Sequence, residues 1–157
     1  MSVQRKGVEM QHRIIAIDPG AQGGVAWTDR EGIVHAISMP DGMTAQADLI
    51  REIWARERIT KAVMEKVGQH VAGNNASASC KFARHCGHLE AILYMLSIPV
   101  IQVAPQSWMK QFGALPKDKT KRKNALKEEA ARRYPHLRVT LATADALCLL
   151  EWGLKRG

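Results

Sequence analysis

The sequence predicts a single α/β domain built on a mixed five-stranded sheet flanked by helices. Five short apolar runs of strand length occur along the chain, and helical patterns separate the later ones, as expected where helical crossovers join parallel strands. The chain has 157 residues, the length of one domain. Its composition, 46% hydrophobic and 24% charged, is typical of a globular protein and excludes a disordered chain or a coiled coil throughout.

The first three strands are expected to form an antiparallel meander. The run RIIAID over residues 13–18 is apolar and is closed by a Pro-Gly pair, which is typical of a buried strand ending in a turn. Residues 25–28 and 33–39 follow as further strands, separated by the polar, glycine-bearing turn at residues 29–32. Strands joined by such tight turns pair in antiparallel fashion.

A helix and a parallel strand come next. Residues 43–58 carry apolar side chains at spacings of three and four, which predicts an amphipathic helix. AVME at residues 62–65 is again a short apolar run ending in a charge. The helix supplies the crossover that a parallel pairing of this strand with the first strand requires.

A polar loop and a long helix follow the fourth strand. Residues 68–77 are polar and contain glycine, so we expect an exposed, mobile loop there. Ser77 or Ser79 is expected to cap a helix that runs to about Ser97. Small residues recur every four positions on that helix, a spacing that permits close approach of another helix or ordinary packing against the sheet: Ala83, Gly87 and Ala91.

The last third of the chain completes the domain. Residues 98–103 form the fifth predicted strand, and Pro105 suits the first turn of a short helix that runs through Trp108. Residues 121–134 have helical composition, and an apolar stripe from Thr143 to the end predicts a final helix with Thr143 as its cap.

Several function classes are excluded. No apolar run approaches the roughly 20 residues that cross a bilayer, and the first twelve residues lack the apolar segment of a secretion signal. We therefore expect a cytoplasmic protein without a membrane partner, with residues 1–12 as a flexible extension before a domain at 13–157. The three cysteines form no CxxC pair, which argues against a disulfide framework or a four-thiolate zinc site. Gly20, Gly23 and Gly24 match no phosphate-binding loop, so no nucleotide cofactor is expected.

Positive charge is concentrated in one segment. The formal net charge is +8 and the sequence pI is near 9.7. Residues 105–138 hold ten basic and three acidic side chains, a net +7 of that total. Such clustering is typical of a protein that binds a polyanion such as nucleic acid, although a solvated helix face is the other interpretation.

Three acidic residues stand in apolar surroundings: Asp18, Glu65 and Asp145. Asp18 ends the first strand and Glu65 the fourth, so parallel pairing places them side by side at the carboxyl ends, where open α/β sheets bind ligands. Three carboxylates that share a small volume need a cation, and hard oxygen ligands select Mg²⁺ or Mn²⁺. With the basic segment, this pattern indicates metal-assisted phosphodiester hydrolysis, for which two-metal sites hold their ions about 3.5–4 Å apart.

Each carboxylate also has a structural interpretation. Asp18 with Pro19 and Gly20 forms a favourable turn sequence. Asp145 complements a helix dipole if Thr143 is the cap. Glu65 would be a surface residue just past the end of a strand.

Five ordered motifs carry a family resemblance. IIAIDPGAQGGVAW, VMEKV, FARHCGHLEAIL, IPVIQVAPQSWMKQFG and ADALCLLEWG follow one another along the chain. Together they resemble the RuvC-like Holliday junction resolvases, the crossover junction endodeoxyribonucleases, in their short phage and prophage versions. The likeness spans residues 13–153. It implies a ribonuclease H-like fold and a homodimer that cuts four-way DNA junctions with Mg²⁺, with Mn²⁺ as the alternative metal.

The resemblance assigns roles to individual residues. Asp18, Glu65 and Asp145 match the catalytic, metal-binding acids of the family. The loop after Glu65 matches the loop that contacts the junction, and its candidate DNA-binding residues are Gln69, His70, Asn74 and Asn75. Phe82 and Arg84 match a phenylalanine and an arginine at the start of the long helix, which the family uses for dimerisation. The basic segment adds residues that would neutralise phosphates: Lys117, Lys119, Lys121, Arg122 and Lys123.

One position departs from the family pattern. RuvC-type enzymes usually carry a fourth metal ligand, Asp or His, three residues before the last acid, and Ala142 stands there. The nearest substitutes are Thr140, Thr143 and His136. The leading prediction is therefore a junction-resolving endonuclease. The alternatives are a catalytically weak protein that binds junctions or branched DNA, and a nuclease of the same fold that acts on another branched or hybrid substrate.

Overall fold

A mixed five-stranded sheet lies at the centre of the molecule. The computed structural model describes residues 12–68 and 75–156. The strand order is β3-β2-β1-β4-β5. Strands β1 (Ile14–Asp18), β2 (Gly24–Thr28) and β3 (Val34–Ser38) form an antiparallel meander, whereas β4 (Lys61–Glu65) and β5 (Val100–Val103) run parallel to β1. The predicted mixed sheet is confirmed.

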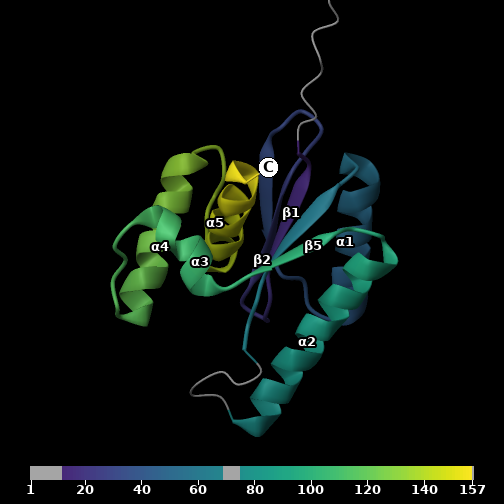
Figure 1. The fold of residues 1–157 in the computed structure, drawn as a ribbon, viewed down its shortest axis with the longest axis horizontal. Helices are drawn as coiled ribbons and strands as arrows, with labels where there is room; N and C mark the ends of the chain where they lie inside the picture. The colour runs from purple at the N-terminus through teal and green to yellow at the C-terminus, as the bar shows by residue number, and fades with distance from the viewer. Residues whose placement is uncertain (1–11, 69–74, 157) are drawn as a thin grey trace, which may run out of the picture.

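Helices cover both faces of the sheet (Figure 1). Helices α1 (Met43–Glu57) and α2 (Ala76–Met95) pack with one side of the strands. On the other side lie α3 (Pro105–Met109), α4 (Lys119–Arg133) and α5 (Leu141–Lys155), with a short 3-10 helix, η1 (Lys110–Phe112), between α3 and α4. This is the single α/β domain that the alternation of apolar runs predicted.

Strand β1 is buried from both faces because helices cover the sheet on either side. Ile15 and Ile17 belong to the core under α1 and α2, whereas Ile14 and Ala16 belong to the core under α5. Successive side chains of a strand point to opposite faces, so the continuous apolar run of β1 is what a central strand requires.

Helix α5 lies directly on the sheet. All its residues from Thr143 to Leu150 are buried. Gly153 permits this close approach, because a Cβ at that position would lie only 2.8 Å from Cγ2 of Val63. The apolar character of the last helix therefore reflects burial on nearly all sides.

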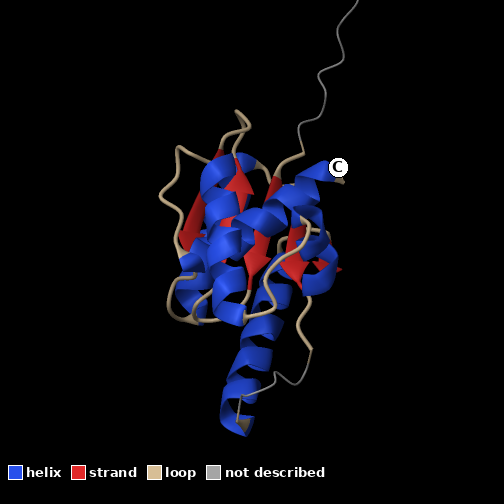
Figure 2. Ribbon diagram, turned by 90° about the vertical axis from the view of Figure 1, so that its left-hand side faces the viewer, coloured by secondary structure: helices blue, strands red, loops and turns tan. Residues whose placement is uncertain are grey.

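Helix α2 extends away from the body of the molecule (Figure 1 and Figure 2). Only Leu89 and Leu93 of its residues are buried, and both lie in its second half. The helix begins earlier than predicted, because Asn75 caps it by accepting a hydrogen bond from the Ala78 amide at 2.8 Å. The prediction of Ser77 or Ser79 as the cap is wrong.

The caps of the last two helices also differ from expectation. Asp118 caps α4 through the Lys121 amide, so this helix starts at Lys119 instead of residue 121. Thr140 caps α5 by accepting a hydrogen bond from the Thr143 amide, and the Thr143 side chain accepts one from the Thr140 amide, which forms a capping box. The prediction of Thr143 as the cap is wrong, because the two threonines act reciprocally across the first turn.

Two sequence predictions concern the N-terminal extension and the lack of a membrane-spanning segment. The predicted extension at residues 1–12 lies outside the described residues, apart from His12. Among the helices that the structure describes, none combines the length and the apolar character needed to cross a membrane.

Candidate active site

The carboxyl ends of β1 and β4 bring two acidic side chains together. The parallel register pairs Ile17 with Met64, so Asp18 and Glu65 occupy adjacent positions where the two strands end. Asp145, from α5, joins them, and all three carboxylates line one cleft of about 340 Å³. The predicted juxtaposition of the three acids is therefore observed.

The environment of the cleft disfavours charged carboxyl groups. Burial raises the pKa of Asp18 well above its usual value, and the negative charges of Asp145 and Glu65 raise it further. Burial likewise raises the pKa of Glu65, with Asp145 adding to the effect. Lys123 acts in the opposite direction on both groups. The three acids thus repel one another in a site of low polarity.

Trp108 holds Glu65 in place. Its side chain is fully buried, and its indole Nε1 donates a hydrogen bond of 2.8 Å to Oε2 of Glu65. The prediction of a short helix through Trp108 is confirmed, and the side chain lies in the core. The sequence did not predict the contact between Trp108 and Glu65. A signal was present, because Val103 pairs with Glu65 in the sheet and Trp108 follows Val103 closely in the chain.

Two glycines allow the backbone to pack tightly around Asp18. A Cβ at Gly23 would lie 2.0 Å from the carbonyl oxygen of Asp18. A Cβ at Gly24 would lie 2.5 Å from the carbonyl oxygen of Ala142, at the start of α5. Only glycine fits at these positions, and the close approach brings the first turn of α5 next to the end of β1. The turn sequence at Asp18 and its place in the cleft are therefore compatible, because the tight turn is what brings α5 close to this carboxylate.

Basic side chains of α4 form another wall of the cleft. Lys119, Arg122 and Lys123 line it. Nζ of Lys123 lies 3.4 Å from Oδ2 of Asp145, an ion pair that the sequence did not predict. Arg122 instead donates a hydrogen bond of 2.8 Å to the carbonyl of Lys117, in the segment before the helix. Lys117 and Lys121 are exposed.

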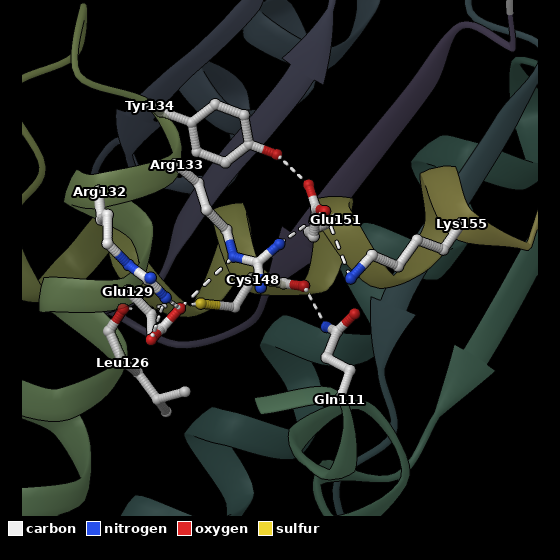
Figure 3. Close-up of polar contacts among 9 residues, drawn as sticks. All are labelled: Gln111, Leu126, Glu129, Arg132, Arg133, Tyr134, Cys148, Glu151 and Lys155. Atoms are coloured by element: carbon white, nitrogen blue, oxygen red, sulfur yellow. Dashed lines mark hydrogen bonds and ion pairs between the residues drawn. The ribbon is translucent and has the colours of Figure 1, made fainter. Parts of the chain in front are cut away.

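A polar network fixes α4 on α5 (Figure 3). Glu151 of α5 accepts hydrogen bonds from Arg133 at 2.9 Å and from the hydroxyl of Tyr134 at 2.7 Å. Nearer the cleft, the thiol of Cys148 points to the carbonyl of Leu126 at 3.7 Å. The same two helices carry Lys123 and Asp145, so these contacts also set the position of that ion pair.

The residues considered as a fourth ligand lie elsewhere. Nε2 of His136 is 2.8 Å from the carbonyl of Val34, which the strand register places at the end of the sheet opposite Asp18. Thr140 and Thr143 hydrogen bond with each other in the capping box of α5. None of these three side chains is among the residues that line the cleft.

The donor set of the cleft suits a hard divalent cation. It offers carboxylate oxygens whose mutual repulsion a cation would relieve. Within residues 12–68 and 75–156, no group of three or more His, Cys, Asp or Glu side chains is placed to hold one metal ion together.

The other predicted DNA-binding residues lie at the start of α2 or precede it in the sequence. The ring of Phe82 lies next to Gly20, within 3.4 Å of where a Cβ would stand, and so borders the turn after Asp18. Arg84 is exposed. Asn75 is exposed and uses its side-chain oxygen as the helix cap. Gln69, His70 and Asn74 lie outside the described residues.

Solved structures share this architecture. The structure of T. thermophilus RuvC in complex with Holliday junction substrate matches with a TM-score of 0.63 at 14% identity, over 92% of this chain and 96% of that one. The chain has the RuvC fold. A second Thermus thermophilus RuvC structure matches with a TM-score of 0.57 at 16% identity, over 92% of this chain and 95% of that one.

A eukaryotic resolvase extends the likeness. The crystal structure of the yeast mitochondrial Holliday junction resolvase Ydc2 matches with a TM-score of 0.54 at 12% identity, over 92% of this chain and 80% of that one. No protein-family model matches the sequence, and a search of curated proteins finds no match either. The predicted ribonuclease H-like, RuvC-type fold is confirmed at the level of structure.

Proposed function

We propose that this protein is a structure-selective endodeoxyribonuclease that resolves four-way DNA junctions by divalent-metal-assisted phosphodiester hydrolysis. The observation that carries the proposal is the cleft in which Asp18, Glu65 and Asp145 meet a basic wall from α4. Carboxylates that gather beside cationic side chains suit a metal ion together with a phosphate. The RuvC fold, described in complex with a Holliday junction substrate, supports this choice of DNA.

The carboxylates of the cleft would supply oxygen ligands for Mg²⁺ or Mn²⁺. When bound, such an ion lowers the pKa of an attacking water and offsets negative charge on the phosphate. Trp108 keeps one oxygen of Glu65 in a hydrogen bond and so fixes the direction of that carboxylate. Asp18 is held by the tight turn after β1, and Asp145 by a helix packed on the sheet. These rigid supports hold the carboxylates in position although they repel one another.

The basic wall of α4 would bind the DNA backbone near the cleft. Lys119, Arg122 and Lys123 line the site itself, and the exposed Lys117 and Lys121 extend the positive surface beyond it. Each contact that neutralises a phosphate releases counterions and steepens the salt dependence of binding. We also assign to the junction arms a set of residues from the first half of α2 and from the sequence just before it: Gln69, His70, Asn74, Asn75, Phe82 and Arg84.

A homodimer through α2 is part of the proposal. The stripe of Ala83, Gly87 and Ala91 is exposed and does not pack on the sheet, which removes one of the two interpretations of its small residues. Beside it lies a groove of about 620 Å³ between α2 and β5. Tyr94 and Met95 are 81% and 77% exposed at the end of the helix. An apolar, small-residue surface of this kind suits a second copy of the helix.

Light scattering coupled to size exclusion tests the dimer. Ala91→Glu places a charge in the middle of the stripe, and we expect it to shift the mass from that of two chains to that of one. Ala131→Glu, at an exposed position of α4, is the matched control and is expected to leave the dimer intact. A wild-type protein with the mass of one chain would contradict this part of the proposal.

Cleavage of a labelled immobile four-way junction tests the function. Linear duplex, flap and RNA–DNA hybrid serve as substrate controls, and Mg²⁺, Mn²⁺ and EDTA as metal conditions. We expect paired nicks across the junction that require metal and disappear in Asp18→Asn and Glu65→Gln, but persist in Asp48→Asn, whose carboxylate is exposed on α1. Faster cutting of a control substrate would support a metal-dependent nuclease but contradict the four-way junction as its substrate.

Two observations favour a second candidate function. Ala142 stands where a fourth ligand is expected, and the three acids are not placed to hold one ion together. A catalytically weak protein that binds junctions or branched DNA fits these two facts. Tight, salt-sensitive junction binding with no cleavage under either metal would establish it in place of the nuclease.

A further inference from the structure

Glu65 reaches the cleft with one of its two oxygens already engaged. The indole Nε1 of Trp108 donates a hydrogen bond of 2.8 Å to Oε2, and the same glutamate lines the cleft. Among the described residues, no hydrogen bond or ion pair involves Oε1. An indole N–H can only donate, so the contact cannot reverse when a ligand binds. Trp108 therefore leaves Oε1 as the oxygen that Glu65 can offer to a ligand.

Trp108 itself is held firmly. Its side chain is fully buried, and its ring meets that of Phe112 edge-on, with the ring centroids 6.4 Å apart. In the same stretch, Gln111 donates a hydrogen bond of 2.9 Å to the carbonyl of Cys148, which anchors this part of the chain on α5 (Figure 3). Because the donor is fixed on several sides, it sets the direction of Glu65 and does not follow it.

The donor is also neutral. A lysine or an arginine in its place would orient the carboxylate as well, but its positive charge would repel a metal ion. The indole of Trp108 orients Glu65 without adding such a charge. The contact therefore suits a carboxylate whose remaining oxygen serves as a metal ligand.

Divalent cations differ in how they use a carboxylate. Ca²⁺ binds roughly 6–8 oxygens at about 2.3–2.6 Å in flexible geometry, and it takes carboxylates through one oxygen or through both. Mg²⁺ requires a near-octahedral shell at about 2.0–2.1 Å and keeps several waters beside one or two carboxylates. A glutamate that offers a single, fixed oxygen meets the requirement of Mg²⁺ better than that of Ca²⁺.

We infer that Trp108 is a positioning residue that makes this cleft select Mg²⁺ over Ca²⁺, by holding Glu65 so that it offers one oxygen instead of two. The inference rests on the proposed function and specifies which metal the site accepts. It assigns Trp108 a role beyond its place in the core, through the hydrogen bond from its indole N–H. The partner is a side chain 43 positions away in the sequence.

Calorimetric titrations with Mg²⁺ and with Ca²⁺, in the absence of DNA, test the inference. Trp108→Phe removes the N–H and keeps an aromatic ring in the core. Mg²⁺ affinity should fall about tenfold, because a group that orients a metal ligand typically contributes about 10–100-fold in affinity. Ca²⁺ affinity should stay the same or rise, since Glu65 can then turn to offer both oxygens. Trp152→Phe is the matched control, because its buried Nε1 has no partner among the described residues, and neither affinity should change.

The ratio of the two affinities separates positioning from a purely structural role, because a loosened fold would weaken the binding of both ions alike. A second variant avoids the cavity that Phe leaves. Benzothienylalanine at position 108 has nearly the shape of tryptophan and carries sulfur in place of the N–H, so it should change the ratio as Trp108→Phe does. Circular dichroism of each variant confirms that the titrations compare folded proteins.

The outcomes separate this inference from the function on which it rests. A wild type that binds Ca²⁺ as tightly as Mg²⁺, or an unchanged ratio in both variants, would overturn the inference. The proposed function would still stand if the wild type cuts junctions with Mg²⁺. A wild type that binds neither ion and cuts no junction would overturn the proposed function as well.

Discussion

Helices α4 and α5 meet in two polar clusters that treat their carboxylates in opposite ways. In the first cluster, the single carboxylate of Glu151 has three partners, two of them cationic: Arg133 at 2.9 Å, the Tyr134 hydroxyl at 2.7 Å and Lys155 at 3.5 Å (Figure 3). In the cleft cluster, three basic residues of α4 line the same cleft as the three acids, but the ion pair found there joins Lys123 to Asp145. Within the described residues, Glu151 is thus fully paired, whereas Asp18 and Glu65 form no ion pair.

The difference indicates which cluster stabilises the fold and which awaits a ligand. A carboxylate that accepts several charge-assisted hydrogen bonds strengthens the packing of the helices that carry it. Carboxylates whose pKa is raised by burial and mutual repulsion destabilise the folded chain until a cation relieves them. Perturbed acids in a cleft are typical of functional sites. The predictions below test this contrast.

The largest expected effect is on catalysis. Asp18→Asn should reduce junction cleavage by roughly 10³-fold, because metal assistance is worth several kcal/mol of transition-state stabilisation. Glu151→Gln, in the first cluster, should leave the rate within about threefold. Single-turnover cleavage with excess enzyme measures both. Equal losses in the two variants would contradict the separation of the clusters.

The next effect concerns stability. Glu151→Gln should lower the free energy of unfolding by about 2 kcal/mol, because hydrogen bonds to charged groups contribute about 1.5–3 kcal/mol. In a chain of this size the melting temperature would fall by about 4–8 °C. Urea denaturation monitored by circular dichroism measures the change. Asp48→Asn breaks the exposed pair with Arg51 and should cost less than about 1 kcal/mol, so a similar loss there would contradict the prediction.

The third effect is smaller and has the opposite sign. Without metal, Asp18→Asn should be more stable than wild type at neutral pH, because the folded protein raises the pKa of this carboxyl by burial and by the charges of Asp145 and Glu65. Each unit of such a rise costs about 1.4 kcal/mol once the group is ionised.

The sign fixes the pH dependence of that difference. Below the unfolded pKa of about 3.9, both side chains are neutral and the two proteins should be similar. The advantage of Asp18→Asn should then grow as the pH rises through the raised pKa of the folded state. Melting curves in EDTA between pH 5 and pH 8 measure it, and Mg²⁺ should stabilise wild type alone. A variant that is less stable than wild type at pH 8 would contradict the interpretation of the cleft.

The smallest effect is on DNA affinity. Lys119→Gln should weaken junction binding modestly and reduce the slope of log K against log salt by about 0.9, the value for one lost phosphate contact. Lys61→Gln, at the end of β4 opposite Glu65, should leave the slope unchanged. Fluorescence anisotropy over a salt series measures both slopes. Identical slopes for Lys119→Gln and Lys61→Gln would contradict the assignment of α4 to the DNA-binding surface.

Much of this site was predictable because it depends on chain order and strand ends. Asp18 and Glu65 each end a short apolar run, and a parallel pairing of those runs is enough to bring them together. The clustering of positive charge before the last helix is visible in the composition of one segment. Helix caps were predicted less well, since Thr140, Thr143 and the serines near Asn75 all have suitable side chains, and local composition does not choose among them.

The order of the elements, the mixed sheet and the three acids can be predicted without a structure, because apolar periodicity and strand ends are local properties of the chain. The folded chain was needed to find that Lys123 reaches Asp145, that Trp108 holds Glu65, and that the small-residue stripe of α2 faces outward. These contacts join residues far apart in the chain, and they depend on how each helix is rotated and placed on the sheet. That rotation is set by the packing of the whole core, which no short stretch of sequence encodes.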